Sequence, residues 1–240
     1  CWTVQIHLGD PVAADPTMRP SSAALRLVVC GTDTDVGKTV VSALLVQGLN
    51  AVYWKPVQSG LEDGGDRERV VELIDLPSDR WIAETYAFQA AVSPHWAAEL
   101  EDTCLDPNRL TLPPIGTRPL VVETAGGLHV PLTRSRQQID QLQRWMLPVV
   151  LVARSGLGTL NHTLLSLEAL RHRGIPVIGL ILNGPVHADN PRTLSEIGDV
   201  PVLAELPHLH PLNAEALRNE WHNQNLGPKF EGFANHPGNR

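Results

Sequence analysis

The sequence predicts an α/β protein whose mostly parallel sheet has helices on both faces. Short apolar runs alternate along the chain with longer helical patterns, and most of the runs lack polar alternation, as expected of strands that are covered on both faces. Strand, helix and strand in repetition imply right-handed crossovers, which place ligands at the carboxyl ends of the strands. The length of 240 residues and the apolar content of 42% suit a single sizeable core.

The expected elements follow from these runs in chain order. The strands read LRLVVC (25–30), AVYWK (51–55), PLVVE (119–123), PVVLVA (148–153), PVIGLIL (176–182) and VPVLAEL (200–206). The helices are expected at residues 38–48, 66–75, 94–101, 138–146, 160–173, 191–197 and 213–222. Two helix starts are legible. Ser93 is suited to cap a helix with Pro94 at its first position, and Asn161 or Thr159 could cap the helix that ends in basic residues.

The chain is expected to form one folded unit with two flanking segments. Residues 1–24, rich in proline and small residues, read as an N-terminal extension. Residues 25–225 read as the single α/β domain, and residues 226–240, LGPKFEGFANHPGNR, read as a loose tail.

Composition narrows the classes of partner. The formal charge of -7 and the pI near 5.8 argue against a protein that holds nucleic acid by charge, so small ligands are expected. No apolar run approaches the roughly 18 residues of a membrane span, and no signal pattern opens the sequence. The three cysteines lack C-x-x-C spacing, and Cys30 lies in an apolar run, which predicts a buried thiol and a reducing cytoplasm.

The stretch GTDTDVGKTVVSALL ends as a phosphate-binding loop does. Its first glycine lies one residue too early for the usual G-x-x-x-x-G-K-[ST] spacing. Nevertheless, Val28 and Val29 are expected to end the preceding strand, and Gly37 to open the turn. Lys38 is then the phosphate lysine, and Thr39 can place its hydroxyl on Mg²⁺. The fold is therefore expected to resemble that of the P-loop NTPases.

Two acidic residues are candidates for the metal side of this site. Glu123 ends the strand PLVVE, where a second metal-binding group is expected, although a lone acid after a strand is more often a solvated loop residue. Asp66, in GGDRER, is a weaker candidate because aspartate beside glycines is commonly a cap or turn residue. The pattern favours a metal role for Glu123 and leaves Asp66 open.

A second ligand is indicated beside the phosphates. Lys55 and Ser59, in WKPVQSG, follow the second strand and should project at the same sheet edge as Lys38. Two lysines and a helix N-terminus can hold an anion, whereas Asp33 and Asp35 could meet an amine-bearing part of the same ligand. Those acids could equally bond backbone N–H groups of their own loop. The pattern indicates an acceptor of mixed charge.

Six motifs, in order and at suitable spacings, resemble those of the dethiobiotin synthetase family. They are GTDTDVGKT, KPVQSG, SPHWAA, VVETAGGLHVPL, VLVARSGLGTLNHTLLSLEALR with GLILN, and ELPHL, and together they span roughly residues 25–210. The resemblance implies a homodimeric enzyme with a fold similar to that of phosphate-loop ATPases. It also implies that 7,8-diaminononanoate, CO₂ and ATP are converted to the cyclic urea of dethiobiotin.

The resemblance also implies roles for individual residues. The ATP site would comprise Asp35, Val36, Gly37, Lys38, Thr39, Val40, Asp66, Glu123, Thr124, Ala125, Gly126, Asn183, Gly184, Pro207, His208 and Leu209. Mg²⁺ falls to Thr39, Asp66 and Glu123. Lys38, Lys55, Thr34 and Ser59 fall around the substrate carbamate. The far carboxylate of the substrate is expected at the helix start in GLGTLNH, including Thr159 and Asn161, supplied by the partner subunit.

The implied chemistry needs charge stabilisation rather than a covalent nucleophile. A carbamate formed from the diamine and CO₂ attacks the γ-phosphorus, and the neighbouring amine captures the resulting mixed anhydride. Lys38, Lys55 and Mg²⁺ suffice for this in principle.

Two positions depart from the family pattern. Asp35 stands where glutamate is usual, and Thr124 stands where glycine is usual. The side chain of Thr124 puts in doubt how closely the loop that contains it can approach the nucleotide.

Other functions are weighed against this resemblance. An ATP-driven switch of the partition or septum-site type would carry an additional lysine where this chain has Asp33. A synthetase of the cobyric-acid amidotransferase type would need a glutaminase domain, for which no length is expected to remain. No Cys/His cluster accompanies His208 and His210, in PHLHP, so no structural zinc site is predicted.

Overall fold

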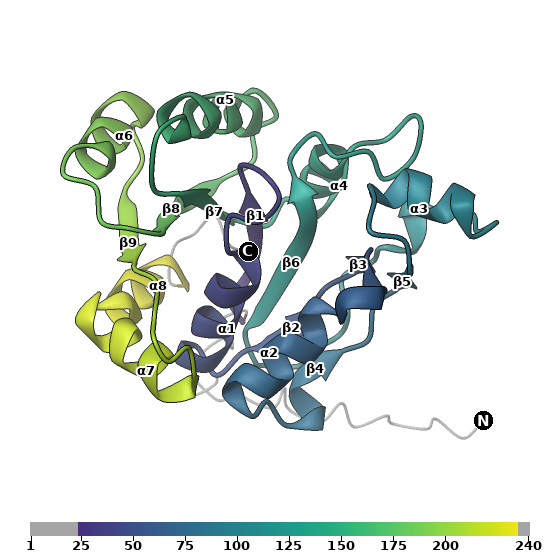
Figure 1. The fold of residues 1–240 in the computed structure, drawn as a ribbon, viewed down its shortest axis with the longest axis horizontal. Coiled ribbons are helices and arrows are strands. Elements are labelled where there is room, and N and C mark those ends of the chain that lie inside the picture. The colour runs from purple at the N-terminus through teal and green to yellow at the C-terminus, as the bar shows by residue number, and fades with distance from the viewer. Residues whose placement is uncertain (1–23, 235–240) are drawn as a thin grey trace, which may run out of the picture.

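The computed structural model describes residues 24–234, and residues 1–23 and 235–240 lie outside the description. One sheet of seven parallel strands has the order β4, β2, β6, β1, β7, β8, β9. These strands are β1 Arg26–Gly31, β2 Val52–Trp54, β4 Trp81–Ile82, β6 Leu120–Gly127, β7 Val149–Arg154, β8 Val177–Asn183 and β9 Val202–Leu206. The predicted α/β class and parallel sheet are confirmed (Figure 1).

Each predicted helix is present and agrees with its expected bounds to within one residue. The helices are α1 Lys38–Gly48, α2 Asp66–Ile74, α3 Pro94–Leu100, α4 Gln138–Trp145, α5 Thr159–His172, α6 Asn190–Gly198 and α7 Ala214–Asn223. Short 3₁₀ helices lie at Leu61–Asp63, Ser78–Arg80 and Pro107–Arg109. No helix among the described residues is long and apolar enough to cross a membrane.

The helices cover both faces of the sheet because successive strand residues point to opposite sides. From β1, Leu27 and Val29 enter a core that α1, α2 and α7 complete. Val28 and Cys30 point the other way, into a core shared with α4, α5 and α6. The two helical layers are visible on either side of the sheet in Figure 1. Burial on both faces explains why the strand sequences are apolar without alternation.

The structure corrects several details of the sequence reading. Strand β1 continues two residues beyond Val29. The residue that precedes α5 is Gly158 in a left-handed conformation, so neither Thr159 nor Asn161 caps this helix. Ser93 does precede Pro94 at the start of α3, but its side chain forms no capping bond to the helix backbone. Its hydroxyl lies 3.0 Å from His95 Nδ1 instead.

The segment expected to be a loose tail begins with a helix, α8 Leu226–Ala234. Leu226 and Phe230 are fully buried, and the Phe230 ring stacks on Trp221 with centroids 5.9 Å apart. These contacts anchor α8 to α7 and to β9. The apolar positions were too few to reveal a helix, and the neighbours that bury them become apparent only in the fold.

A small second layer was also missed. Two short parallel strands, β3 Val57–Gln58 and β5 Tyr86–Ala87, pair outside the main sheet. Together with α3 they form a separate apolar cluster around Phe88 and Leu110. Strands of two residues leave no periodic signal, so only the fold reveals them. They place the loop after β3 beside the carboxyl edge of the main sheet.

Candidate functional site

The loop between β1 and α1 forms a turn that requires glycine at its end. Gly37 has φ 94° and directly precedes α1. A Cβ at this position would lie 2.0 Å from Asn183 Nδ2, and that amide donates to Val36 O over 3.0 Å. The left-handed backbone and the close side chain therefore both exclude a larger residue. No side chain among the described residues caps the start of α1, which suits the binding of an anion there.

Lys38 begins α1 and is nearly buried, with 7% of its surface exposed. Its Nζ donates to Asp33 O, 2.9 Å away within the same loop. Burial lowers the pKa of Lys38, and the charge of Glu123 partly offsets this effect. The ammonium therefore donates to a carbonyl of the loop. A bound anion could take the place of that carbonyl as the partner of the ammonium.

Asp33 and Asp35 have different environments. Asp33 Oδ1 accepts a hydrogen bond from the backbone N–H of Thr34 over 2.7 Å, and its Oδ2 accepts one from Arg154 over 3.1 Å. The structure therefore favours the loop-bonding alternative for Asp33. Asp35 has φ 55° and is exposed. Its short side chain lines the cavity described below.

Three oxygen-bearing side chains converge next to the loop. Thr39 Oγ1 lies 2.9 Å from Asp66 Oδ1 and 3.0 Å from Glu123 Oε1. Asp66 begins α2 and Glu123 lies inside β6, so separate elements bring these groups together. Carboxylate and hydroxyl oxygens are ligands that Mg²⁺ accepts, and a cation already lies on both carboxylates in the form of the Lys55 ammonium. The donor set therefore fits a divalent cation.

Lys55 is buried between the two acids. Its Nζ lies 3.3 Å from Glu123 Oε1 and forms a close ion pair with Asp66. Burial lowers the pKa of Lys55, but the charges of Glu123 and Asp66 more than offset this and leave the pKa above its usual value. Burial likewise raises the pKa of Asp66, yet Lys55 and Thr39 hold it below its usual value. Lys55 and Asp66 are therefore both charged at neutral pH.

Gln58 is a residue of this site to which the sequence reading assigned no role. Its Oε1 accepts a hydrogen bond from the backbone N–H of Asp66 over 3.1 Å, and its Nε2 donates to Ser59 O over 2.7 Å. Gln58 therefore caps the start of α2, because Gly65 has no side chain to do so. The only feature of the sequence that pointed to Gln58 was its place within the motif KPVQSG.

A cavity of about 730 Å³ unites most of the predicted site residues. Those lining it are Thr34, Asp35, Gly37, Lys38, Thr39, Val40, Lys55, Ser59, Asp66, Glu123, Ala125 and Gly126. Residues without a predicted role also line it, among them Arg69 of α2, Ser93 and Val130. Phosphate-binding, cation-binding and lysine groups thus share one space that is large enough for a small ligand.

The remaining predicted residues lie elsewhere. Val36 and Thr124 are buried, and Thr124 Oγ1 is directed to Gly126 O at 3.4 Å. A second group lies at the carboxyl ends of β8 and β9, near the loop but outside the lining of the cavity, and comprises Asn183, Gly184, Pro207, His208 and Leu209. Thr159 and Asn161 belong to α5 and do not line this cavity of their own chain either.

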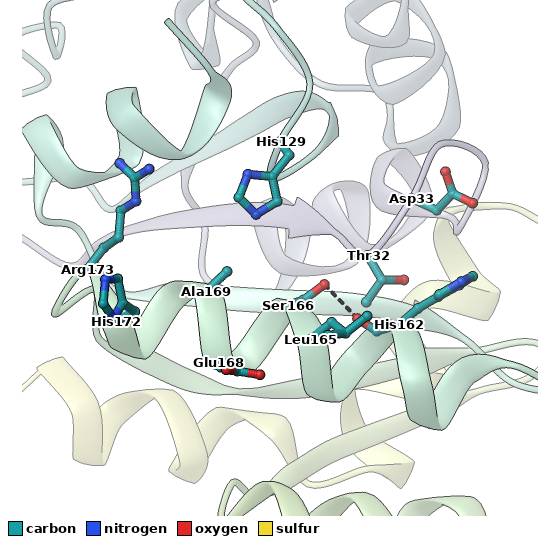
Figure 2. Close-up of a pocket in the computed structure, with 10 residues that line it drawn as sticks. All are labelled: Thr32, Asp33, His129, His162, Leu165, Ser166, Glu168, Ala169, His172 and Arg173. Carbon is teal, nitrogen blue, oxygen red and sulfur yellow. Dashed lines mark hydrogen bonds between the residues drawn. The ribbon is translucent and has the colours of Figure 1, made fainter.

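A second cavity of about 720 Å³ runs along α5. Thr32 and Asp33 border one end, His129 lies opposite the helix, and the remaining lining residues belong to α5 or follow it (Figure 2). Ser166 on this helix donates to His162 O over 2.7 Å. Thr32 and Asp33 directly precede Thr34, which lines the first cavity, so residues of one loop border both cavities.

The histidines form no metal centre in the described part of the chain. Among these residues, no group of three or more His, Cys, Asp or Glu side chains is placed to hold a metal ion. The candidate cation site of Thr39, Asp66 and Glu123 has only two acids and relies on a hydroxyl as its third group.

The chain is similar to known proteins in sequence and in fold. Residues 25–216 match the AAA domain family. The chain is 51% identical over 193 residues to the ATP-dependent dethiobiotin synthetase of Afipia carboxidovorans, covering 80% of this chain and 92% of the relative. It is 54% identical over 190 residues to the biotin biosynthesis bifunctional protein of Bordetella avium, covering 79% and 41%, respectively. Among solved structures, a ParA family ATPase from Chlorobium tepidum has a TM-score of 0.54 at 12% identity, covering 90% of this chain and 99% of that one. At this identity the likeness concerns the fold alone.

Proposed function

The chain belongs to the family of ATP-dependent dethiobiotin synthetases, and we propose that it carries out the reaction for which they are named. In this reaction 7,8-diaminononanoate and CO₂ form a carbamate. The carbamate oxygen attacks the γ-phosphorus of ATP, and the neighbouring amine closes the urea ring with loss of phosphate. The observation that carries the proposal is the convergence of Lys38, Lys55 and the two carboxylates in one cavity.

The cradle at the start of α1 binds the phosphates of ATP in this proposal. The backbone N–H groups after Gly37 and the ammonium of Lys38 meet the phosphate oxygens, because a helix start and a lysine together favour an anion. Asp35 to Val40, Glu123 to Gly126, and the residues at the ends of β8 and β9 complete the nucleotide site. The hydrogen bond from Asn183 to Val36 O supports this arrangement, since it joins the end of β8 to the loop.

In the same proposal Thr39, Asp66 and Glu123 would hold Mg²⁺, which would neutralise charge on the phosphates when bound. The mutual distances of these groups support this assignment. Lys55 then faces the carbamate beside the γ-phosphate, with Thr34 and Ser59 around the substrate. Electrostatic stabilisation of a phosphoryl transfer needs no covalent residue.

We further propose a homodimer in which the start of α5 reaches the substrate bound to the partner. Thr159 and Asn161 lie away from the cavity of their own chain, which supports a role toward another one. Apolar side chains near this helix start are exposed, Leu157 at 105% and Leu165 at 56%, as expected of a surface that a second subunit covers. The cavity beside α5 adjoins this face.

The buried thiol of Cys30 suits a reducing cytoplasm.

Product formation tests the proposed function directly. Purified protein is incubated with 7,8-diaminononanoate, ATP, Mg²⁺ and bicarbonate, and dethiobiotin is measured by mass spectrometry. We expect product only when all four are present, and none with Lys38→Ala. ATP hydrolysis that ignores the diamine and gives no urea product would instead favour a partner-binding ATPase switch.

A further inference from the structure

Tyr53 contacts one oxygen of the Glu123 carboxylate inside the sheet. Its hydroxyl donates to Glu123 Oε2 over 3.0 Å, and both side chains are completely buried. The two residues come from neighbouring strands, since β2 pairs with β6 and Tyr53 lies opposite Val121. Tyr53 does not line the cavity. It therefore reaches the candidate cation site from behind, through the carboxylate.

The two oxygens of Glu123 have separate partners. Oε1 faces the cavity side, where Thr39 Oγ1 lies 3.0 Å away and Lys55 Nζ 3.3 Å away. Oε2 is held by Tyr53. A hydrogen bond on one oxygen limits rotation of the carboxylate, so the other oxygen keeps its direction. A buried charged group is costly unless it is hydrogen-bonded, which makes the phenol the natural partner for Oε2.

We propose that Tyr53 is a positioning residue that sets the direction of Glu123 and thereby the affinity of the divalent-cation site. The inference rests on the proposed function for the presence of that cation. Partners behind a metal ligand typically account for a factor of roughly 10 to 100 in metal affinity. Tyr53 thus has two roles: its ring packs in the core, and its hydroxyl orients Glu123.

A matched pair of variants separates these two roles. Tyr53→Phe keeps the ring and removes only the hydroxyl. Tyr86→Phe is the control, because Tyr86 is also buried and its hydroxyl also bonds, accepting from the Asp106 N–H over 3.0 Å. Tyr86 belongs to a different apolar cluster. Both variants lose one buried phenol hydroxyl, but only Tyr53 touches the carboxylate.

Calorimetry provides a readout that does not depend on turnover. Mg²⁺ is titrated into the protein loaded with a non-hydrolysable ATP analogue. We expect Mg²⁺ to bind roughly 10- to 100-fold more weakly to Tyr53→Phe than to the wild type, and Tyr86→Phe to match the wild type. In a Glu123→Gln background the Tyr53 substitution should cause no further loss, because the group through which it acts is already changed. Equal Mg²⁺ affinity in wild type and Tyr53→Phe would overturn the proposal.

The wild-type protein offers a second measurement, which does not require that Tyr53→Phe folds. The chain contains 2 tyrosines, so labelling the tyrosine Cζ with carbon-13 gives two resonances, which Tyr86→Phe assigns. Adding Mg²⁺ to the analogue complex should move the Tyr53 resonance and leave the Tyr86 resonance in place. A stationary Tyr53 resonance with Mg²⁺ bound, or no Mg²⁺ binding at all, would contradict the proposal. Mg²⁺ binding with no dethiobiotin formed would reject the proposed function alone.

Discussion

The ammonium of Lys55 lies 3.3 Å from Glu123 Oε1, and both side chains are buried. The same lysine is paired with Asp66, so one ammonium contacts both carboxyl groups that are proposed to hold Mg²⁺. Without a counter-ion, a buried carboxylate beside a second, partly buried one would be costly. Lys55 therefore lies between the proposed cation and carbamate sites.

Lys55→Gln should reduce turnover much more than nucleotide binding. Lys38 belongs to the phosphate cradle itself, whereas Lys55 comes from the segment after β2 and its charge matters once a carbamate lies beside the γ-phosphate. Removing one preorganised charge-stabilising group typically lowers the rate by roughly 10²- to 10³-fold. Dethiobiotin formation at saturating diamine and analogue binding by calorimetry without Mg²⁺ measure the two effects. Turnover within about threefold of wild type, worth only ~0.7 kcal/mol, would remove Lys55 from the mechanism.

Lys55→Gln should also bind a divalent cation more tightly when no nucleotide is present. The ammonium lies on both carboxylates, and unit charges about 4 Å apart interact by about 4 kcal/mol at an effective dielectric constant near 20. We expect Mn²⁺ affinity, measured by electron paramagnetic resonance, to rise at least about tenfold on this basis. Lys38→Gln is the control, since its ammonium bonds Asp33 O rather than a carboxylate. An equal rise in both variants would attribute the effect to net charge alone.

Two inactive variants should restore activity when they are mixed. Asn161→Asp places a negative charge where the partner's substrate carboxylate is proposed to dock, and Lys38→Ala disables the cradle of its own chain. In a hybrid dimer one of the two sites has both wild-type parts, so a random mixture should recover roughly a quarter of the wild-type activity. Light scattering and subunit exchange must verify that hybrids form. A mixture that stays inactive despite verified hybrids would refute the shared site.

Cys30 should make the protein less stable at alkaline pH. Burial raises the pKa of the Cys30 thiol from 9.0 to about 12, with the charge of Lys38 partly opposing this. Between these pH values the folded state keeps the proton while the unfolded state loses it, so the free energy of unfolding falls as pH rises, by up to about 1.4 kcal/mol per pH unit.

Urea unfolding across this pH window provides the measurement. The wild type minus Cys30→Ala difference in unfolding free energy should decline with increasing pH. Cys104→Ala, which removes an exposed thiol instead, is the matched control. A pH-independent difference for Cys30→Ala would mean that the thiol ionises equally in both states.

Local patterns in the sequence determined most of the architecture. Strands buried on both faces must be apolar throughout, so runs such as LRLVVC are recognisable without any partner. The turn at Gly37 was likewise legible, because a left-handed residue before a helix and a following lysine are properties of adjacent residues. Elements whose stability depends on distant neighbours were not legible. The two-residue strand β3 and the helix α8 around Phe230 are held by contacts that no local period encodes.

The candidate site likewise combines residues that a local pattern indicates with residues that only the fold brings together. The sequence indicated Glu123 from its place at the end of an expected strand, although β6 in fact continues to Gly127. Asp66 alone resembled an ordinary turn residue. Its proximity to Thr39 across 27 residues, and that of Lys55 to Glu123 across 68, arises because β2 and β1 both flank β6. That strand order is set by the packing of the whole sheet, which also places Tyr53 behind Glu123. Sequence spacing determines which residues follow a strand, whereas only long-range packing determines which of them meet.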